Sequence, residues 1–422
     1  MHPFEPDPTP TPSSSPTPTD SSAPVVSRRQ LVAGAAGLAG TAMLSSATSS
    51  AYASGRDTSR ERWAKRAERS YAALRKHFAT SHGLYREQYP VDPADRPYSF
   101  EWPYSQAHVA VLDLTGMAGA GRRYRDALAA HRHAQQHYWS DAGSTGKPGF
   151  ASYVMPPYGD GGDFFYDDNE WVALADLQHH AIYRDRASLR EAGTLFDLVV
   201  SGWHDDSHAA PGGVFWTQAP WSDDRNTVSN MPGAQVGLRL HQLTGRRSYL
   251  DWSLRMYRWT NRHLQRPDGL FHDHLDLQGT VEKTIWSYNQ GVPVSVNALL
   301  YEITRQRRYL DEAVRIAQAA TDFYAEADGD QTRLDGQPPF FNSIYFKNLL
   351  RLESITGGRR HQRAMEAYAD RVWETRRDPG TGLFDFGDDA EVAGRTQMIE
   401  QAAMIQILAV LAWPRDRYRL LY

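Results

Sequence analysis

Helix-forming segments recur along the chain in pairs, and this recurrence restricts the possible folds more than any other feature. Segments with helical spacing of apolar residues begin near residues 102, 167, 226, 286, 342 and 396, about 55 to 65 residues apart. Several end in L-T-G or I-T-G, which suits a helix stop. A basic, tyrosine-containing segment such as GRRSYLDWSLRMYRWTNRHL then starts a second helix. The sequence therefore predicts helix pairs repeated six times.

The two helices of a pair differ in the distribution of their apolar residues. The first is rich in Ala, Gly, Ser, Leu and Val around its whole circumference, as expected of an inner helix, whereas the second is amphipathic and charged. Six inner helices ringed by outer ones, beginning with RERWAKRAERSYAALRKHF, form an (α/α)6 barrel. A linear solenoid of helix pairs is the alternative. Closure is favoured because the last segment, AAMIQILAVLAW, is apolar and does not resemble a polar capping repeat.

The loops that precede the inner helices share a pattern. PGGVFWTQAPW, DGLFHDHLDLQGTVEK and GTGLFDFGDD each contain a G-L/V-F segment, preceded by Asp or Gly in the first two, shortly before the next inner helix. Because they recur at the same point of each repeat, we expect these loops to cluster at one end of the barrel. The N-termini of the inner helices lie at the same end, which predicts a binding site there.

Two adjacent aspartates, Asp167 and Asp168, follow an aromatic run in GGDFFYDDNEW. Asp167 with Glu170 three residues later is a capping-box pattern, which would place Asp167 at the N-cap. The alternative is chemistry, because paired carboxylates in an aromatic cleft suit the hydrolysis of glycosidic bonds. The surrounding aromatic residues favour the second interpretation.

The other motifs give weaker indications of function. HDDSH and FHDHLD are rich in histidine but lack the spacing of zinc hydrolases, so a solvated or supporting role is expected and no metal site is predicted. The polar opening WSYNQG of one inner helix suits either helix capping or the binding of sugar hydroxyls by its amides. The chain contains neither a Gly-rich phosphate loop nor a G-x-S-x-G elbow.

The first 53 residues differ from the rest. Residues 1–26 are rich in Pro, Ser and Thr and are expected to be disordered. Residues 27–53 contain Arg28 and Arg29 before a weakly apolar stretch that ends in Ala51-Tyr52-Ala53, which indicates a twin-arginine signal cleaved after Ala53. A retained membrane anchor is the alternative, but the apolar run is short for a span of roughly 20 residues. A misassigned start codon would explain the extension before the signal.

Charge and cysteine content exclude several classes. The formal net charge is −4 with no basic block in the body, which argues against a nucleic-acid partner. The absence of cysteine excludes disulfides, a lipoprotein anchor, thiol catalysis and Cys-ligated zinc. We expect a secreted monomer with a single domain over residues 54–422, without a stable membrane anchor after cleavage.

Five segments together resemble glycoside hydrolase family 76: FEWPYSQAHVAVLDL, GGDFFYDDNEWVALA, NTVSNMPGAQVGLRL, DGLFHDHLDLQGTVEKTIWSYNQG and IEQAAMIQILAVLAW. The resemblance extends from about residue 60 to the C-terminus. It implies an (α/α)6 barrel, endo-acting and retaining hydrolysis of α-1,6-linked mannan, and no cofactor. It also places the catalytic pair on Asp167, as nucleophile, and Asp168, as general acid and then base.

The substrate-binding candidates are the aromatic and amide residues at the starts of the inner helices or in the loops before them. They are Trp102, Tyr166, Asn169, Trp216, Asn230, Trp286, Tyr288, Asn289 and Gln290. The substrate expected from the resemblance is an α-mannan or a mannooligosaccharide. The alternatives are a transglycosidase or another (α/α)6 carbohydrate enzyme, such as an unsaturated-uronyl hydrolase, that uses the same aspartates, and a mannan-binding protein without turnover.

Overall fold

The computed structural model describes residues 41–206, 208–329, 331–387 and 394–422, with side chains described from residue 59 onward. The chain divides into two units, Met1–Ala53 and Ser54–Tyr422. The expected extension over residues 1–26 and the twin-arginine motif lie outside the described residues, so the boundaries assigned to them stay predictions. No helix in the described ranges is long and apolar enough to cross a membrane.

Six helices form an inner ring: α2 (Glu101–Leu114), α4 (Tyr166–Tyr183), α6 (Thr227–Thr244), α8 (Ser287–Thr304), α10 (Pro339–Thr356) and α12 (Met398–Leu411). Small and apolar residues occupy all sides of these helices, so they are buried around their circumference. Every residue of α12 is buried.

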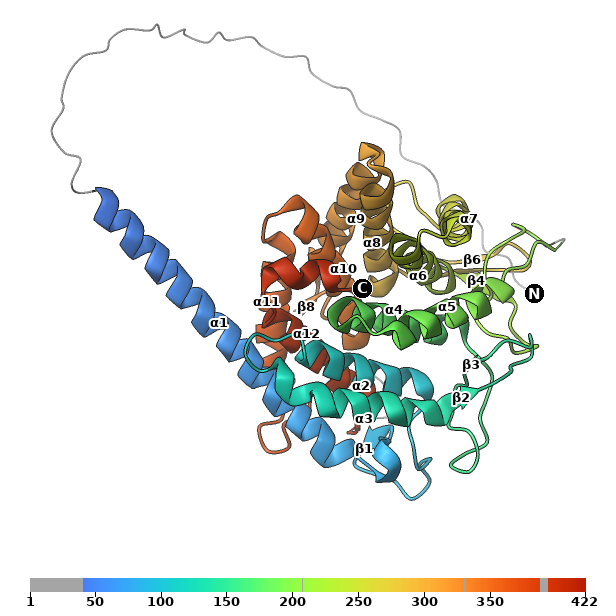
Figure 1. The fold of residues 1–422 in the computed structure, drawn as a ribbon, viewed down its shortest axis with the longest axis horizontal. Coiled ribbons are helices and arrows are strands. Elements are labelled where there is room, and N and C mark those ends of the chain that lie inside the picture. Colours follow the sequence, from blue (N-terminus) through green and yellow to red (C-terminus); the bar gives the residue numbers. More distant parts are fainter. Residues whose placement is uncertain (1–40, 207, 330, 388–393) are drawn as a thin grey trace, which may run out of the picture. The chain divides into compact units, whose positions relative to one another are not determined.

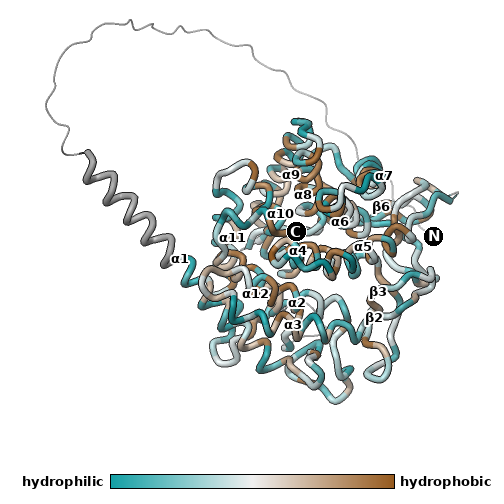
Figure 2. Tube along the Cα trace, viewed as in Figure 1, coloured by the Kyte–Doolittle hydropathy of each residue, from teal (hydrophilic) through white to brown (hydrophobic). Residues whose placement is uncertain are grey.

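The outer helices lie outside this ring: residues 54–78 of α1 (Thr41–Phe78), and α3 (Arg125–Gln135), α5 (Arg186–Ser201), α7 (Arg247–His263), α9 (Arg307–Ala325) and α11 (Arg360–Thr375). Among the described side chains, each of these helices buries one face only. In α7, for example, only Leu250, Ser253, Met256, Trp259 and Thr260 are buried. Figure 2 shows the contrast, with α12 mainly hydrophobic and α3 mainly hydrophilic.

The ring is closed. Each inner helix contacts the next along the chain, and α12 contacts α2. The strands β1 (Gln88–Tyr89) and β9 (Thr396–Gln397) pair antiparallel and join the two ends of the ring a second time. The C-terminus lies among the inner helices (Figure 1). The predicted (α/α)6 barrel is therefore confirmed, and the solenoid alternative is wrong.

Short strands and 3-10 turns make up the connections. Two hairpins and one three-stranded sheet lie in the described connections: β2 (Trp139–Ser140) with β3 (Gly149–Phe150), β7 (Ala327–Asp328) with β8 (Gln331–Thr332), and the sheet of β4 (Asp224–Asn226), β5 (His274–Asp276) and β6 (Val281–Glu282). The 3-10 turns are η1 (Ser81–Gly83), η2 (Gly121–Tyr124), η3 (Gln136–Tyr138) and η5 (Arg415–Leu420). Gly245 ends α6 in the left-handed conformation, as its L-T-G motif predicts, whereas Arg184 and Arg305 adopt that conformation after α4 and α8.

Buried polar groups connect the inner helices inside the ring. The Lys347 ammonium of α10 lies 2.7 Å from the Asp113 carboxylate of α2 and donates to Gln406 of α12. Gln178 of α4 donates to the other oxygen of Asp113. Because a buried charge is costly unless it is paired and hydrogen-bonded, this cluster fixes the relative positions of four inner helices.

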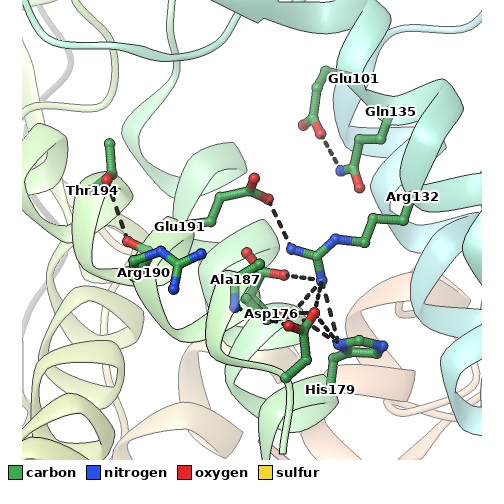
Figure 3. Close-up of polar contacts among 11 residues, drawn as sticks. Glu101, Arg132, Gln135, Asp176, His179, Ala187, Arg190, Glu191 and Thr194 are labelled. Carbon is green, nitrogen blue, oxygen red and sulfur yellow. Dashed lines mark hydrogen bonds and ion pairs between the residues drawn. The ribbon is translucent and has the colours of Figure 1, made fainter. Parts of the chain in front are cut away.

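A second polar network stands between α3, α4 and α5. Arg132 of α3 contacts Asp176 at 3.0 Å, His179 at 3.3 Å and Glu191 at 3.6 Å (Figure 3). Asp176 and His179 belong to α4, two to three turns beyond the aspartate pair. The guanidinium therefore holds the helix that carries Asp167 and Asp168 against its outer neighbours.

Candidate active site

A cavity of about 830 Å³ opens at the end of the barrel where the inner helices begin. Its walls combine aromatic rings with carboxyl groups. The aromatic residues are Phe100, Trp102, Tyr153, Phe165, Trp171, Trp216, Tyr288, Phe340 and Phe341, and the acidic residues are Glu87, Asp160, Asp163, Asp167, Asp168, Asp224 and Asp273. A hollow of this size with apolar walls and a few converging polar groups suits a small ligand or a segment of a polymer.

Asp167 and Asp168 lie in the first turn of α4 and both face this cavity. Phe165 is the N-cap of α4, and no side chain caps it. The capping-box interpretation is therefore wrong, because the helix begins at Tyr166 and Asp167 is its second residue. Instead, Asp167 Oδ2 accepts a hydrogen bond from Nε1 of Trp216 at 3.3 Å.

The two carboxyls differ in their electrostatic surroundings. Burial raises the pKa of Asp167 to about 7, while the hydrogen bond from Trp216 and the backbone N–H groups of the helix start act in the opposite direction. For Asp168, burial first and then the charges of Asp167 and Glu101 raise the pKa well above its usual range. These surroundings favour ionisation of Asp167 before Asp168, and they favour the protonated form of Asp168.

Two further carboxyls stand behind the pair. Glu101, the first residue of α2, is fully buried and accepts a hydrogen bond from Nε2 of Gln135 at 2.9 Å (Figure 3). Burial raises its pKa to about 8. Glu170, one turn beyond Asp167, is also fully buried, and burial raises its pKa well above the usual range. Burial therefore favours the neutral form of both side chains.

Another polar group of the cavity wall is Asp273, which directly precedes β5 of the three-stranded sheet. Asp273 Oδ2 contacts Nδ1 of His274 at 3.0 Å, and Asp273 Oδ1 accepts from Nδ2 of Asn289 at 2.9 Å. The hydrogen bond to Asp273 raises the pKa of His274, while burial raises the pKa of Asp224. Two residues of the FHDHLD motif, Asp273 and His274, thus line the cavity.

The carboxyl and histidine groups of the site are also the side chains that could ligate a metal ion. Within the described ranges, no group of three or more His, Cys, Asp or Glu residues has the geometry to hold a metal ion. Residues 207, 330 and 388–393 are outside those ranges, and a metal-free site remains a prediction.

Three of the amides predicted to bind substrate have another role. Asn169 accepts from N–H of Phe150 at 2.8 Å and donates to its carbonyl at 3.0 Å. Asn230 makes the same pair of bonds with Val214, and Gln290 with Phe271. All three side chains are fully buried and are absent from the cavity wall. Each is the fourth residue of its inner helix and fixes the loop that precedes that helix; we call this arrangement the amide clamp.

The clamp explains the recurring Gly-Leu-Phe loops. Gln401, the fourth residue of α12, accepts from the N–H of Phe384 at 3.1 Å in the GTGLFDF segment. Backbone groups of a buried loop need partners, and a side-chain amide offers one donor side and one acceptor side. The amide of Gln290 in the WSYNQG motif, which suggested sugar binding, therefore holds a loop of the site in place.

The remaining predicted residues separate into two sets. Trp102, Trp216 and Tyr288 line the cavity with the two aspartates. Tyr166 is buried away from it, Trp286 packs behind the wall on Phe341 at 5.4 Å between ring centroids, and Asn289 contacts the cavity only through Asp273. Tyr288 stacks on Phe341, with ring centroids 4.0 Å apart.

Sequence reasoning missed several wall residues: Asp163, Phe165, Asp224, Asp273, His274, Phe340 and Phe341. Phe340 and Phe341 open an inner helix in PPFFNS, so the rule that selected Trp102 could have found them. Asp224 carried no such signal, because it enters the cavity through the pairing of β4 with β5.

A closed ring of helix pairs with a carboxyl pair in an aromatic cleft is typical of the (α/α)6 glycoside hydrolases as a class. The family model for glycosyl hydrolase family 76 matches residues 97–409, and the chain belongs to this family.

Among curated relatives, the chain is 33% identical over 119 residues to mannan endo-1,6-alpha-mannosidase DCW1 of Candida glabrata, which is 26% of each chain. It is 24% identical over 188 residues to the protein of the same name from Candida albicans, which is 40% of this chain and 41% of that protein. These matches thus span between a quarter and two fifths of the relatives' length.

Solved structures share the fold. The family 76 mannosidase Bt3792 from Bacteroides thetaiotaomicron has a TM-score of 0.72 at 24% identity, covering 83% of this chain and 98% of that one. An inactive double-aspartate variant of the α-1,6-mannanase GH76A of Salegentibacter sp. HEL1_6, in complex with α-1,6-mannotriose, has a TM-score of 0.65 at 18% identity, covering 83% and 99%.

Proposed function

We propose that this protein is a retaining, endo-acting glycoside hydrolase that cleaves α-1,6-mannosidic linkages in mannan-type polysaccharides. The observation that carries the proposal is the Asp167–Asp168 pair, two buried carboxyls with differently raised pKa values in the aromatic cavity. The names of the curated relatives and the mannotriose complex of the Salegentibacter enzyme support the choice of substrate.

The spacing of adjacent residues supports retention. Neighbouring Cα atoms are about 3.8 Å apart, and side chains one step along a helix diverge by roughly 100°. Two such carboxyls suit the roughly 5 to 5.5 Å of retaining enzymes better than the roughly 6.5 to 9.5 Å of inverting ones.

In the first step, the Asp167 carboxylate attacks the anomeric carbon while Asp168 gives its proton to the departing glycosidic oxygen. In the second step, Asp168, now ionised, takes a proton from water. The resulting oxygen nucleophile attacks the anomeric carbon and releases Asp167 as a carboxylate. Trp102, Trp216 and Tyr288 stack on sugar rings, and Asp224 and Asp273 accept hydrogen bonds from hydroxyl groups.

The test is azide rescue with a mannoside that bears a good leaving group. We expect azide to restore turnover of Asp168→Ala with retention and of Asp167→Ala with inversion. The opposite pattern would reverse the assignment of the two roles, and a wild-type product of inverted configuration would refute retention.

Two alternatives are separated by simple assays. A transglycosidase would transfer mannosyl units to an acceptor mannoside in preference to water, which product sizing detects. A binding protein would release no reducing sugar from α-1,6-mannan, and its affinity would be unchanged in the Asp167→Asn, Asp168→Asn double variant.

We further propose export as a monomer through the twin-arginine route. Replacing Arg28 and Arg29 by lysine in the producing cell should retain the precursor inside. Unchanged export of that variant would refute the route without affecting the enzymatic proposal.

A further inference from the structure

Trp221 is a large apolar side chain on the rim of the cavity that the proposed chemistry does not use. It is 59% exposed, more than any other large hydrophobic side chain in the described residues. Its ring centroid lies 6.1 Å from that of Trp216 and 6.3 Å from that of Phe165, and both of these rings line the cavity. The three rings form a continuous aromatic surface from the cavity wall to solvent.

The loop that carries Trp221 is held in place. Thr217 Oγ1 donates to the carbonyl of Phe164 at 2.8 Å, and the N–H of Gln218 donates to the same carbonyl at 3.0 Å. The Gln218 side chain accepts from the N–H of Ser144 and donates to Thr145, each at 2.9 Å. A ring presented by a fixed loop loses little conformational freedom when a ligand stacks on it.

The ring of Trp221 is also uncovered, in contrast to three other partly exposed tryptophans. Arginine guanidinium groups lie over the rings of Trp203, Trp252 and Trp373 at 4.3 to 4.8 Å. Within the described ranges no cation stacks on Trp221 in this way. Asp223, two residues further along the chain, is exposed and Asp224 lines the cavity, so the same loop carries carboxylate acceptors for hydroxyl groups.

We propose that Trp221 forms a distal subsite that binds a hexopyranosyl unit of the polysaccharide outside the cavity. The inference rests on the proposed function for the identity of the sugar. One face of a pyranose ring is apolar and its rim carries hydroxyl groups. This combination matches a free indole face beside carboxylates. The subsite acts on long chains, since a short substrate that fills the cavity does not reach the rim.

The test compares short and long substrates in matched variants. Trp221→Ala should raise KM for α-1,6-mannan about tenfold, the loss expected for one stacked aromatic contact. It should leave kcat for α-1,6-mannan unchanged. It should also leave both kcat and KM for an aryl mannoside unchanged. Trp221→Phe should recover most of the affinity. Leu243→Ala serves as the control, because Leu243 is 40% exposed near the C-terminus of α6, away from the inner-helix starts.

The outcomes distinguish the two proposals. An unchanged KM for α-1,6-mannan in Trp221→Ala, with normal wild-type hydrolysis, overturns the distal subsite alone. An equal loss on the aryl mannoside and the polymer also overturns it, because Trp221 would then act on the cavity itself. A wild-type protein that neither hydrolyses nor binds any α-mannan overturns the proposed function, and the subsite with it.

Discussion

At the scale of single residues, Asp167 and Asp168 differ because consecutive positions at a helix start face different groups. Asp167 accepts from Trp216 and lies near the free N–H groups of α4, which favour its anion. Asp168 faces Glu101 and Asp167, which disfavour its anion. Two identical side chains can thereby take the opposite roles of nucleophile and acid.

The first prediction concerns the charge of Glu101. Because Glu101 helps to raise the pKa of Asp168, Glu101→Gln should lower that pKa and move the alkaline limb of kcat/KM to lower pH. The acidic limb, set by ionisation of Asp167 at about pH 7, should move less. The pH profile on an aryl mannoside measures both limbs.

Glu353→Gln is the matched control, since Glu353 is a buried carboxyl with a raised pKa near the C-terminal end of α10. Its pH limbs should equal those of the wild type. An unmoved alkaline limb in Glu101→Gln would refute the coupling of Glu101 to Asp168.

The second prediction concerns stability. Both aspartates have raised pKa values in the folded state, so the folded protein binds more protons than the unfolded chain above about pH 4. Their contribution to stability is present below the unfolded pKa and is lost as pH rises through the folded pKa. The Asp167→Asn, Asp168→Asn variant should therefore exceed the wild type in Tm by a margin that grows from pH 5 to pH 8. A constant margin would contradict the raised pKa values.

The sequence identified some of these residues and missed others for physical reasons. Asp167 and Asp168 could be predicted because an acidic pair inside an aromatic run is conspicuous. Their helix position could not, because the start of α4 depends on the bridge of Phe165 with Thr217, far along the chain. Asn169 and Gln290 were assigned to sugar because an amide that binds a hydroxyl and one that binds a loop have the same sequence pattern.

At the scale of secondary-structure elements, the amide clamp couples α4, α6, α8 and α12 each to the loop before it. The loops carry Trp216 and Asp273, and the helices carry Asp167, Asp168 and Tyr288. Helical periodicity predicted the helices and their order, since six repeats of one pattern give a strong signal. The loop geometry depends on bonds between residues 16 to 19 positions apart, which periodicity does not detect.

The third prediction tests the clamp. Asn230→Ala leaves the buried N–H and C=O of Val214 without a partner, at a cost of about 1 to 3 kcal/mol per group. The free energy of unfolding should fall accordingly, and kcat/KM should also fall because the Trp216 loop loses its anchor. Urea unfolding and kinetics well below Tm give the two values.

Asn297→Ala is the control, because Asn297 is equally buried and bonds to Tyr257 and Pro293 without touching a loop of the site. It should reduce stability but leave kcat/KM near that of the wild type. Equal kinetic losses in both variants would mean that the clamp has no specific effect on the site.

At the scale of the compact unit Ser54–Tyr422, polar clusters join all six inner helices. The cluster of Asp113, Lys347, Gln178 and Gln406 connects α2, α4, α10 and α12. Gln235 of α6 donates to Ser295 of α8 and Asn348 of α10, which completes the ring. Apolar faces alone would allow helices to slide or rotate, whereas directional bonds select one arrangement. The sequence predicted closure from the apolar last helix but not these pairings, because they join distant residues: Asp113 and Lys347 are 234 positions apart.

The last prediction concerns the buried ion pair at this scale. Lys347→Met removes the cation beside Asp113, whose Oδ2 lies 2.7 Å from Nζ, and both side chains are almost fully buried. Loss of one partner of a buried pair costs about 3 to 5 kcal/mol, so the urea midpoint should fall steeply. The double variant Asp113→Leu, Lys347→Met removes both charges and should recover much of that loss.

Arg247→Met is the control, because it breaks an exposed ion pair with Asp251 on α7 and should change the urea midpoint little. If Lys347→Met is as stable as the wild type, the ring does not depend on the ion pair. If the double variant is less stable than Lys347→Met, the two charges act separately.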